Sequence, residues 1–425
     1  MNVLFDLTYL AAWYKTPSGR TGVFRVADEV RCALAARPDC ALRYAADGHV
    51  AEAADYLQAA SGNLTDLVYP ESARRLSALA APARRLARRD LSDRRPVARL
   101  RRRLAATIAR AADRLTSRLP ADALAWADVY HSPVTDVHPQ VDRLGTRRPV
   151  RFVTVYDLIA LLFPQYYEPG QVETIRRSHA RVADHWVLAI SECTRRDLVA
   201  HCGCDPARVF VTPLAASEHF RPCRDPEAIS RVRAACGIPP GPYVLSLCTL
   251  EPRKNLPFVI RAFARLVHEE KFPDLSLVLV GGTGWKTAAL ERALADLPDL
   301  RGRIVVTGFV PDPDLAALYS GALAFVYLSL YEGFGLPPLE AMQCGVPVVT
   351  SNTSSLPEVV GDAGQTVDPC DEDGFCAALG SLVRDPARRA AWAERSLARA
   401  AEFSWAHTAE KTVAAYRAAL EAEGR

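Results

Sequence analysis

Short runs of apolar and β-branched residues recur along the chain, and helix-like patterns separate them. The runs are residues 150–156, 186–191, 243–247, 275–281, 304–308, 323–328 and 346–350. Strands that are apolar throughout, instead of alternately apolar and polar, are typical of parallel sheets that helices cover on both faces. The alternation of strand and helix therefore predicts an α/β fold built from doubly wound parallel sheets.

A dense cluster of glycine and proline interrupts this pattern near residues 220–242. One helical stretch lies there between two groups of breakers, which is typical of a linker. Because 425 residues are too many for one compact core, we predict two domains, 1–222 and 223–402. A cleft between the two domains is the expected place for a ligand.

Composition excludes several classes of protein. The net charge of +3 is close to neutral for this length, so the overall balance indicates neither a nucleic-acid nor a membrane partner. The longest apolar runs are strand-sized, and the N-terminal residues enter a strand pattern without a secretory signal. The eleven cysteines include no Cys-x-x-Cys motif, which favours reduced thiols over zinc or disulfides. We therefore expect a cytoplasmic protein.

Residues 74–118 do not fit the pattern of alternating strands and helices. Arginine is very frequent there, including the run Arg101 to Arg103, and leucine and isoleucine recur at helical spacing. An amphipathic basic helix of this kind binds anionic membrane surfaces, here the cytoplasmic face of the inner membrane. A solvated face of an arginine-rich helix is the alternative, and both interpretations stay open.

The segment Tyr331 to Met342 carries two carboxylates, Glu332 and Glu340, around a glycine turn. Gly333 and Gly335 have no Cβ, so the backbone can bend sharply and a ligand can approach it closely. The two prolines that follow suit the first turn of a helix.

The amides of Phe334, Gly335 and Leu336 would then lie at the positive end of that helix, where phosphate or sugar hydroxyls bind. The carboxylates beside them can accept hydrogen bonds from vicinal hydroxyls. The segment therefore predicts a nucleotide-sugar site.

Lys254 is conspicuous because the chain has only five lysines. With Arg253 it follows the predicted strand 243–247 and precedes a helix, and strand ends of this kind face the cleft in open α/β sheets. Together the two side chains can offer a planar fork and a point charge to one diphosphate.

Several segments of the C-terminal half resemble retaining glycosyltransferases of family 4, whose fold is GT-B. They are residues 250–255, 281–285, 307–310, 332–340 and 354–361. Upstream, residues 21–25, 130–133, 154–159 and 189–192 are similar to the glycine loop and the strand ends of that family. Residues 403–425 resemble its last helix, which crosses back onto the N-terminal domain. The resemblance implies two Rossmann-like domains facing a central cleft, the first with an arginine-rich helical insertion at 74–118.

The resemblance also implies roles for individual residues. The catalytic set is Glu332, Arg253, Lys254 and Asp157. The donor-binding set is Glu340, Gly333, Phe334, Gly335, Leu336, Thr249, Gly22 and Gly282. Tyr156, which stands where the family commonly has histidine, and His131 are candidates for the donor sugar or the acceptor side. No metal and no cofactor are implied, because the two cations neutralise the leaving diphosphate.

These observations predict a retaining, metal-independent transferase that moves a hexose from a nucleotide-diphosphate sugar to a growing bacterial polysaccharide such as O-antigen or capsule. The resemblance to mannosyltransferase-like members favours GDP-mannose, with UDP- and dTDP-sugars as alternatives, and a lipid-linked glycan as the acceptor. A hydrolase or epimerase of similar fold and an inactive binding protein at the membrane are the competing interpretations. We expect no nucleic-acid partner.

Overall fold

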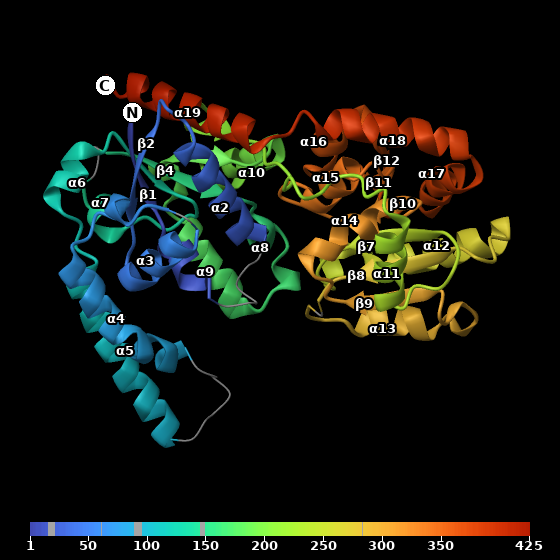
Figure 1. Ribbon diagram of the computed structural model, residues 1–425, viewed down its shortest axis with the longest axis horizontal. Helices are drawn as coiled ribbons and strands as arrows, with labels where there is room; N and C mark the ends of the chain where they lie inside the picture. Colours follow the sequence, from blue (N-terminus) through green and yellow to red (C-terminus); the bar gives the residue numbers. More distant parts are fainter. Residues whose placement is uncertain (16–21, 61, 89–95, 145–148, 283) are drawn as a thin grey trace.

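The computed structural model describes residues 1–15, 22–60, 62–88, 96–144, 149–282 and 284–425, and Figure 1 shows its two bodies. The first contains a six-stranded parallel sheet of order β2-β1-β3-β4-β5-β6. Its strands are β1 (Asn2–Asp6), β2 (Ala41–Ala45), β3 (Val129–Ser132), β4 (Val150–Val155), β5 (Trp186–Ala189) and β6 (Val209–Val211).

The second body contains another six-stranded parallel sheet, of order β12-β11-β10-β7-β8-β9. Its strands are β7 (Tyr243–Leu247), β8 (Ser276–Val280), β9 (Ile304–Gly308), β10 (Ala324–Tyr327), β11 (Val348–Ser351) and β12 (Gln365–Val367). Each apolar run noted in the sequence coincides with a strand, so the predicted doubly wound α/β fold is confirmed. β7 lies between β10 and β8, and this reversal of strand order leaves a crevice at the carboxyl ends of β7 and β10.

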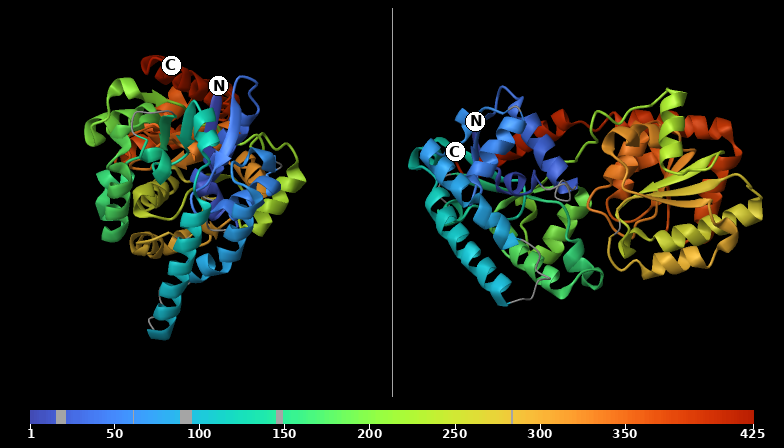
Figure 2. Two further views of the ribbon diagram at one scale, coloured as in Figure 1. Left: turned by 90° about the vertical axis from the view of Figure 1, so that its left-hand side faces the viewer. Right: turned by 60° about the horizontal axis from the view of Figure 1, so that its bottom comes forward.

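Helices cover both faces of each sheet (Figures 1 and 2). In the first body they are α1 (Thr8–Trp13), α2 (Gly22–Ala35), α3 (Val50–Ala59), α4 (Glu71–Arg88), α5 (Pro96–Thr116), α6 (Ala121–Trp126), α7 (Pro139–Asp142), α8 (Ile159–Leu162), α9 (Pro169–His179) and α10 (Glu192–Cys202). The helices that follow β6 in the chain are α11 (Pro226–Ala235), α12 (Leu256–Glu270), α13 (Ala288–Ala295), α14 (Asp312–Ser320), α15 (Leu336–Gln343), α16 (Leu356–Val360), α17 (Glu372–Arg384), α18 (Pro386–Ala400) and α19 (Trp405–Ala422).

The last helix, α19, leaves the second body and packs on the first (Figure 1). Its inward residues Ala409, Val413 and Tyr416 belong to the hydrophobic core that surrounds the first sheet. The Tyr416 hydroxyl also contacts Nδ1 of His131 on β3 at 2.6 Å. Apolar burial and this polar contact together hold α19 on the first body.

The arginine-rich segment forms two helices, α4 and α5, that pack against each other and project from the first body (Figures 1 and 2). Part of the predicted segment, residues 89–95, lies outside the described residues. Among the described residues, no helix combines the length and the apolar character that crossing a membrane requires.

Candidate active site

A cavity of about 420 Å³ lies at the carboxyl ends of the strands, between the two bodies. The first body contributes the start of α2 and the residues after β4, and the second contributes the segments after β7, β8 and β10. Twelve of the predicted site residues line it: Gly22, Tyr156, Asp157, Thr249, Lys254, Gly282, Glu332, Gly333, Phe334, Gly335, Leu336 and Glu340.

The centre of the site is a buried carboxylate that two cations share. Lys254 Nζ lies 2.5 Å from Glu332 Oε1, and Arg253 Nη1 lies 2.9 Å from the same oxygen. Arg253 also pairs through Nη2 with Glu251. Each of these four residues is at most 9% exposed, so their charges interact in a medium much less polar than water.

The mutual attraction outweighs the cost of burying the charges. Burial alone would raise the pKa of Glu332, but Lys254 and Arg253 reverse that effect and lower it to about 2. Burial would likewise lower the pKa of Arg253, yet Glu332 and Glu251 raise it above its usual range. The carboxylate is therefore ionised at neutral pH, and it holds both cations in place.

Local structure fixes the two cations beside the crevice. They end a short 3₁₀ turn, Pro252–Lys254, that follows β7, and Asn255 closes the turn at φ 58°. Asparagine tolerates this left-handed conformation better than most residues do. Lys254 Nζ also donates to the Tyr327 hydroxyl at 2.7 Å and lies 5.1 Å from the centre of that ring.

The glycine turn brings the second body into contact with the first. A Cβ on Gly333 would lie 2.2 Å from the Tyr156 carbonyl oxygen, so no larger residue fits there without movement. The Ser191 hydroxyl, at the start of α10, donates to the Gly333 carbonyl oxygen at 2.7 Å. The turn that carries Glu332 is thus built against the end of β4.

The second predicted carboxylate, Glu340, lies on α15 and faces the same cavity. The Tyr319 hydroxyl donates to Glu340 Oε2 at 2.9 Å. Burial raises the pKa of Glu340, and the positive charge of Arg25 on α2 opposes this rise. The two carboxylates therefore differ, because among the residues that the structure describes only Glu332 is paired directly with cations.

Two predicted residues come from the end of β4. Asp157 Oδ1 accepts a hydrogen bond from the Ile159 amide at 2.9 Å, and burial raises the pKa of this carboxyl. The Tyr156 hydroxyl donates to the Pro133 carbonyl oxygen at 2.9 Å, and burial raises its pKa also. Both residues thus belong to the wall that the first body contributes.

Two other predicted residues lie off the cavity wall. Arg253 stands behind Glu332 and reaches the site through that carboxylate. His131 lies in the core of the first body, where its ring nitrogens contact Tyr416 at 2.6 Å and Thr154 at 2.8 Å. Burial lowers the pKa of His131 to about 3, so it is a neutral core residue between β3, β4 and α19. The structure does not bring His131 to the cavity, because α19 covers it.

Sequence reasoning missed other wall residues. Arg25 of α2 and Asp312 of α14 both line the cavity and form an ion pair, with Nη1 and Oδ2 3.6 Å apart. Phe309 also lines the cavity and is 77% exposed. Arg25 is close in sequence to the predicted site residue Gly22, which was the one signal that could have indicated it. Its partner Asp312 is distant in sequence, so no local pattern indicated that residue.

Further contacts bridge the two bodies around the cavity. The Glu358 carboxylate of α16 accepts hydrogen bonds from the amides of Glu192 and Cys193, at 2.8 and 2.7 Å. An acidic side chain at the start of α10 also complements the helix dipole. On another side of the cleft, the Trp285 indole donates to the Tyr166 carbonyl oxygen at 2.6 Å.

Comparison with known proteins gives consistent similarities. Residues 232–399 match the family described as "Glycosyl transferases group 1". The O-antigen chain mannosyltransferase B of Escherichia coli is 35% identical over 291 residues, which cover 68% of this chain and 74% of that protein. The GDP-mannose-dependent alpha-(1-6)-phosphatidylinositol monomannoside mannosyltransferase of Mycolicibacterium smegmatis is 32% identical over 269 residues, or 61% and 67% of the two chains.

Solved structures share the fold over nearly the whole chain. Anabaena HepE, solved in complex with UDP and glucose, aligns over 97% of this chain and 98% of its own. The TM-score is 0.62 at 16% sequence identity. This similarity confirms the predicted GT-B fold.

The contact at Gly333 predicts a specific steric effect. We expect Gly333→Ala to reduce the free energy of unfolding by roughly 1–3 kcal/mol, because the new methyl group would collide with the Tyr156 carbonyl. Gly282→Ala is the matched control, since a Cβ there meets nothing within 4 Å. Chemical denaturation measures both, and equal stability of the two variants would contradict the tight contact.

The low pKa of Glu332 predicts a pH dependence. In the folded chain this pKa is about 2, against an ordinary value of 4.5, so the ionised carboxylate stabilises the fold above that ordinary value. We expect Glu332→Gln to cost roughly 3 kcal/mol near neutral pH. The difference from the wild type should shrink as the pH falls from about 4.5 toward 2, where Glu332 itself becomes neutral. Unfolding curves at several pH values measure it, and a difference independent of pH would exclude the ion pair.

Proposed function

We propose that this chain, which belongs to the group 1 glycosyltransferases, a retaining family, transfers a mannosyl residue from GDP-mannose to a growing polysaccharide of the O-antigen type. The names of two relatives support the sugar, and one of them supports the donor. A lipid-linked glycan is the proposed acceptor, and UDP- and dTDP-sugars are the alternative donors.

The observation that carries the proposal is the pair of buried cations at the end of β7. Lys254 lines the cavity, and Arg253 stands directly behind the shared Glu332 oxygen. A diphosphate in the cavity would lie beside Lys254 and near the N-terminus of α15, which favours negative charge. Both cations are already desolvated and held in place, so little reorganisation is needed when the leaving group becomes charged.

The two carboxylates of the second body bind different parts of the donor. Both cations contact Glu332 Oε1, so a hydroxyl of the donor sugar is bound by the other oxygen of that carboxylate. Glu340 lies one helical turn further along and binds the ribose hydroxyls. The amides of residues 334–336 lie between the two carboxylates and contact the sugar.

Catalysis in this proposal is mainly stabilisation of the departing diphosphate. The bond from the anomeric carbon to the phosphate oxygen breaks, and the acceptor oxygen attacks from the same face. The acceptor proton passes to the departing phosphate oxygen, so no side chain needs to act as a general base. Lys254 and Arg253 stabilise the negative charge that develops on that oxygen. Asp157, on the opposite wall, orients a sugar hydroxyl by accepting its hydrogen bond.

The acceptor approaches from the first body. A second cavity of about 240 Å³ lies there at the carboxyl ends of β1 and β3, and its wall includes Tyr9, Trp13 and Asp47. Pro133 also lines it, and its carbonyl oxygen accepts the hydrogen bond from Tyr156 in the wall of the first cavity. Aromatic faces beside a few polar groups suit a sugar chain.

Turnover with GDP-mannose and a mannose-containing glycan tests the proposal. We expect Lys254→Ala to lower kcat by a factor on the order of 10²–10³, because it removes a charge that stabilises the leaving group. Lys411→Ala, which removes an exposed lysine of α19, is the control and should keep full activity.

Near-wild-type activity of Lys254→Ala would contradict the role of the cation pair. Release of GDP without any acceptor would favour a hydrolase. Turnover of UDP- or dTDP-sugars alone would replace the proposed donor.

A further inference from the structure

The outer face of α5 exposes an unusual set of large apolar side chains. Val97, Leu100, Leu104, Ile108 and Leu115, which we refer to as the apolar stripe, are each between 51% and 72% exposed. Their spacing of three, four, four and seven residues places them on one side of the helix. The stripe runs along a helix of 21 residues, which is about 30 Å long.

Small residues occupy the inner face of the same helix. Ala105 and Ala109 are buried where α5 packs on α4. Because alanine fills the interface between α4 and α5, the larger side chains of α5 lie outside that interface. Helix α5 therefore has small apolar residues on its buried face and large apolar residues on its exposed face.

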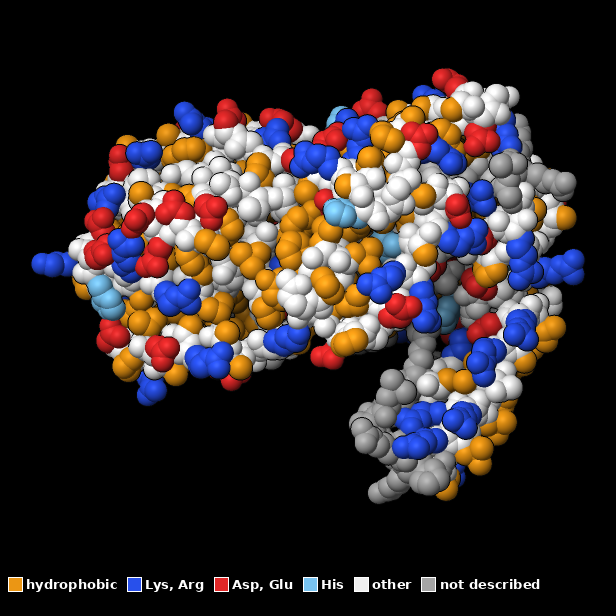
Figure 3. All heavy atoms as spheres, turned by 180° about the vertical axis from the view of Figure 1, so that it is seen from behind, with side chains coloured by type: hydrophobic (Ala, Val, Ile, Leu, Met, Phe, Trp, Pro, Cys, Tyr) orange, Lys and Arg blue, Asp and Glu red, His pale blue; other side chains and the backbone are white. Residues whose placement is uncertain are grey.

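Arginines border the apolar stripe. The sequence of α5 contains six arginines, one aspartate, and no lysine or glutamate. At about 100° per residue, Arg103, Arg110 and Arg114 follow one edge of the stripe and Arg101 follows the other. Figure 3 shows the two kinds of side chain next to each other along the projecting hairpin.

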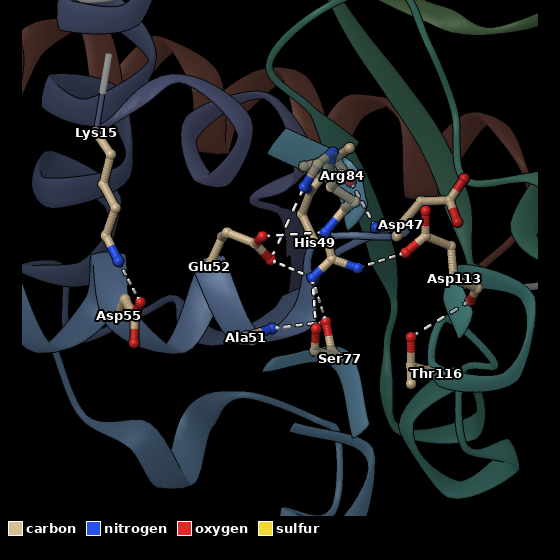
Figure 4. A network of polar contacts seen from close by, with 12 residues as sticks. Lys15, Asp47, His49, Ala51, Glu52, Asp55, Ser77, Arg84, Asp113 and Thr116 are labelled. Atoms are coloured by element: carbon tan, nitrogen blue, oxygen red, sulfur yellow. Dashed lines mark hydrogen bonds and ion pairs between the residues drawn. The ribbon is translucent and has the colours of Figure 1, made fainter. Parts of the chain in front are cut away.

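The single aspartate of α5 is turned away from this face. Asp113 Oδ1 accepts a hydrogen bond at 2.7 Å from Arg84 of α4, and Arg84 is buried (Figure 4). Arg84 also donates to both oxygens of Glu52 on α3, at 3.0 and 2.9 Å, and to the Ser77 carbonyl at 2.6 Å. Arg84 belongs to the arginine-rich segment of the sequence, but it is buried and anchors the hairpin to the first body.

We propose that the apolar stripe and its flanking arginines dock this protein on an anionic lipid bilayer. Leucine, isoleucine and valine enter the boundary between headgroups and acyl chains, to a depth of roughly 5–10 Å. The arginines keep their apolar stems along this surface and pair their guanidinium groups with lipid phosphates. The hydrogen bonds of Arg84 hold the hairpin on the first body, so the apolar stripe is exposed on the protein before it binds lipid.

A second copy of the chain fits this face less well. Two stripes packed against each other would bring the arginines of one chain against the same arginines of the other, and like charges oppose such pairing. A nucleic acid would satisfy the arginines but would leave the leucines exposed to water. An anionic bilayer satisfies both kinds of side chain.

Docking of this kind would hold the active-site cavity near an acceptor that is itself anchored in the membrane. That consequence rests on the proposed function, whereas the docking does not. Vesicle binding is therefore measured without substrate, and a failure of either proposal can be recognised separately.

The test is co-sedimentation of the full chain with vesicles of phosphatidylglycerol and phosphatidylethanolamine, compared with vesicles of phosphatidylcholine. The apolar variant changes Leu100, Leu104 and Ile108 to serine, and we expect it to lose at least about ten-fold in vesicle partitioning. The matched control is Val306→Ser with Leu397→Ser, because these side chains are exposed apolar residues outside the hairpin. All changed side chains are exposed, so the unfolding midpoint should stay near that of the wild type.

A second variant removes charge instead of apolar surface. Changing Arg101, Arg103 and Arg114 to glutamine should weaken binding to anionic vesicles by a factor on the order of 10², as three near-surface cations are lost. The control removes the same charge elsewhere, at Arg176, Arg177 and Arg231, which are also exposed.

Three results would overturn the docking proposal. One is a wild-type chain that does not sediment with anionic vesicles, and another is binding that both hairpin variants retain. The third is a wild-type dimer that the serine variant converts to a monomer without any vesicle binding, which would assign the face to a second copy. Light scattering after gel filtration measures that oligomeric state.

Discussion

The geometry of this site depends on one buried carboxylate. Glu332 comes from the loop after β10, whereas Arg253 and Lys254 come from the turn after β7, the neighbouring strand. Together with Glu251, which pairs with Arg253, they make four charges that neutralise one another at this depth, and the ion pairs fix the relative positions of two loops. In the proposed function, a diphosphate entering the cavity would find the Lys254 ammonium already desolvated and oriented.

The same loop also connects the two bodies. Gly333 follows Glu332 directly and packs on the Tyr156 backbone, and the Ser191 hydroxyl holds its carbonyl. The position of the carboxylate therefore depends on how the bodies meet. The hydrogen bonds of Glu358 and Trp285 and the packing of α19 also join the two bodies at separate points. Residues of the first body line the same cavity as this loop for this reason.

Much of this was predictable from the sequence, because the signals are local. Continuous apolar runs marked the central strands, and a glycine turn before two prolines marked the start of α15. The failures have a common physical origin in contacts between distant segments. His131 was a candidate site residue at the end of its strand, but Tyr416, 285 residues later, covers it. Arg84 belongs to the arginine-rich segment, and the sequence did not show that Glu52 and Asp113 pair with it. No local pattern reveals such partners.

Calorimetric titration with guanosine diphosphate and guanosine monophosphate tests most directly whether the buried cation pair binds a diphosphate. Wild-type protein should bind the diphosphate more tightly by about 10- to 100-fold, the effect of one further charge-assisted contact. Lys254→Ala should lose this preference, while Lys411→Ala should keep it. Equal affinity for the two nucleotides in the wild type, or a preference that survives in Lys254→Ala, would contradict the assignment.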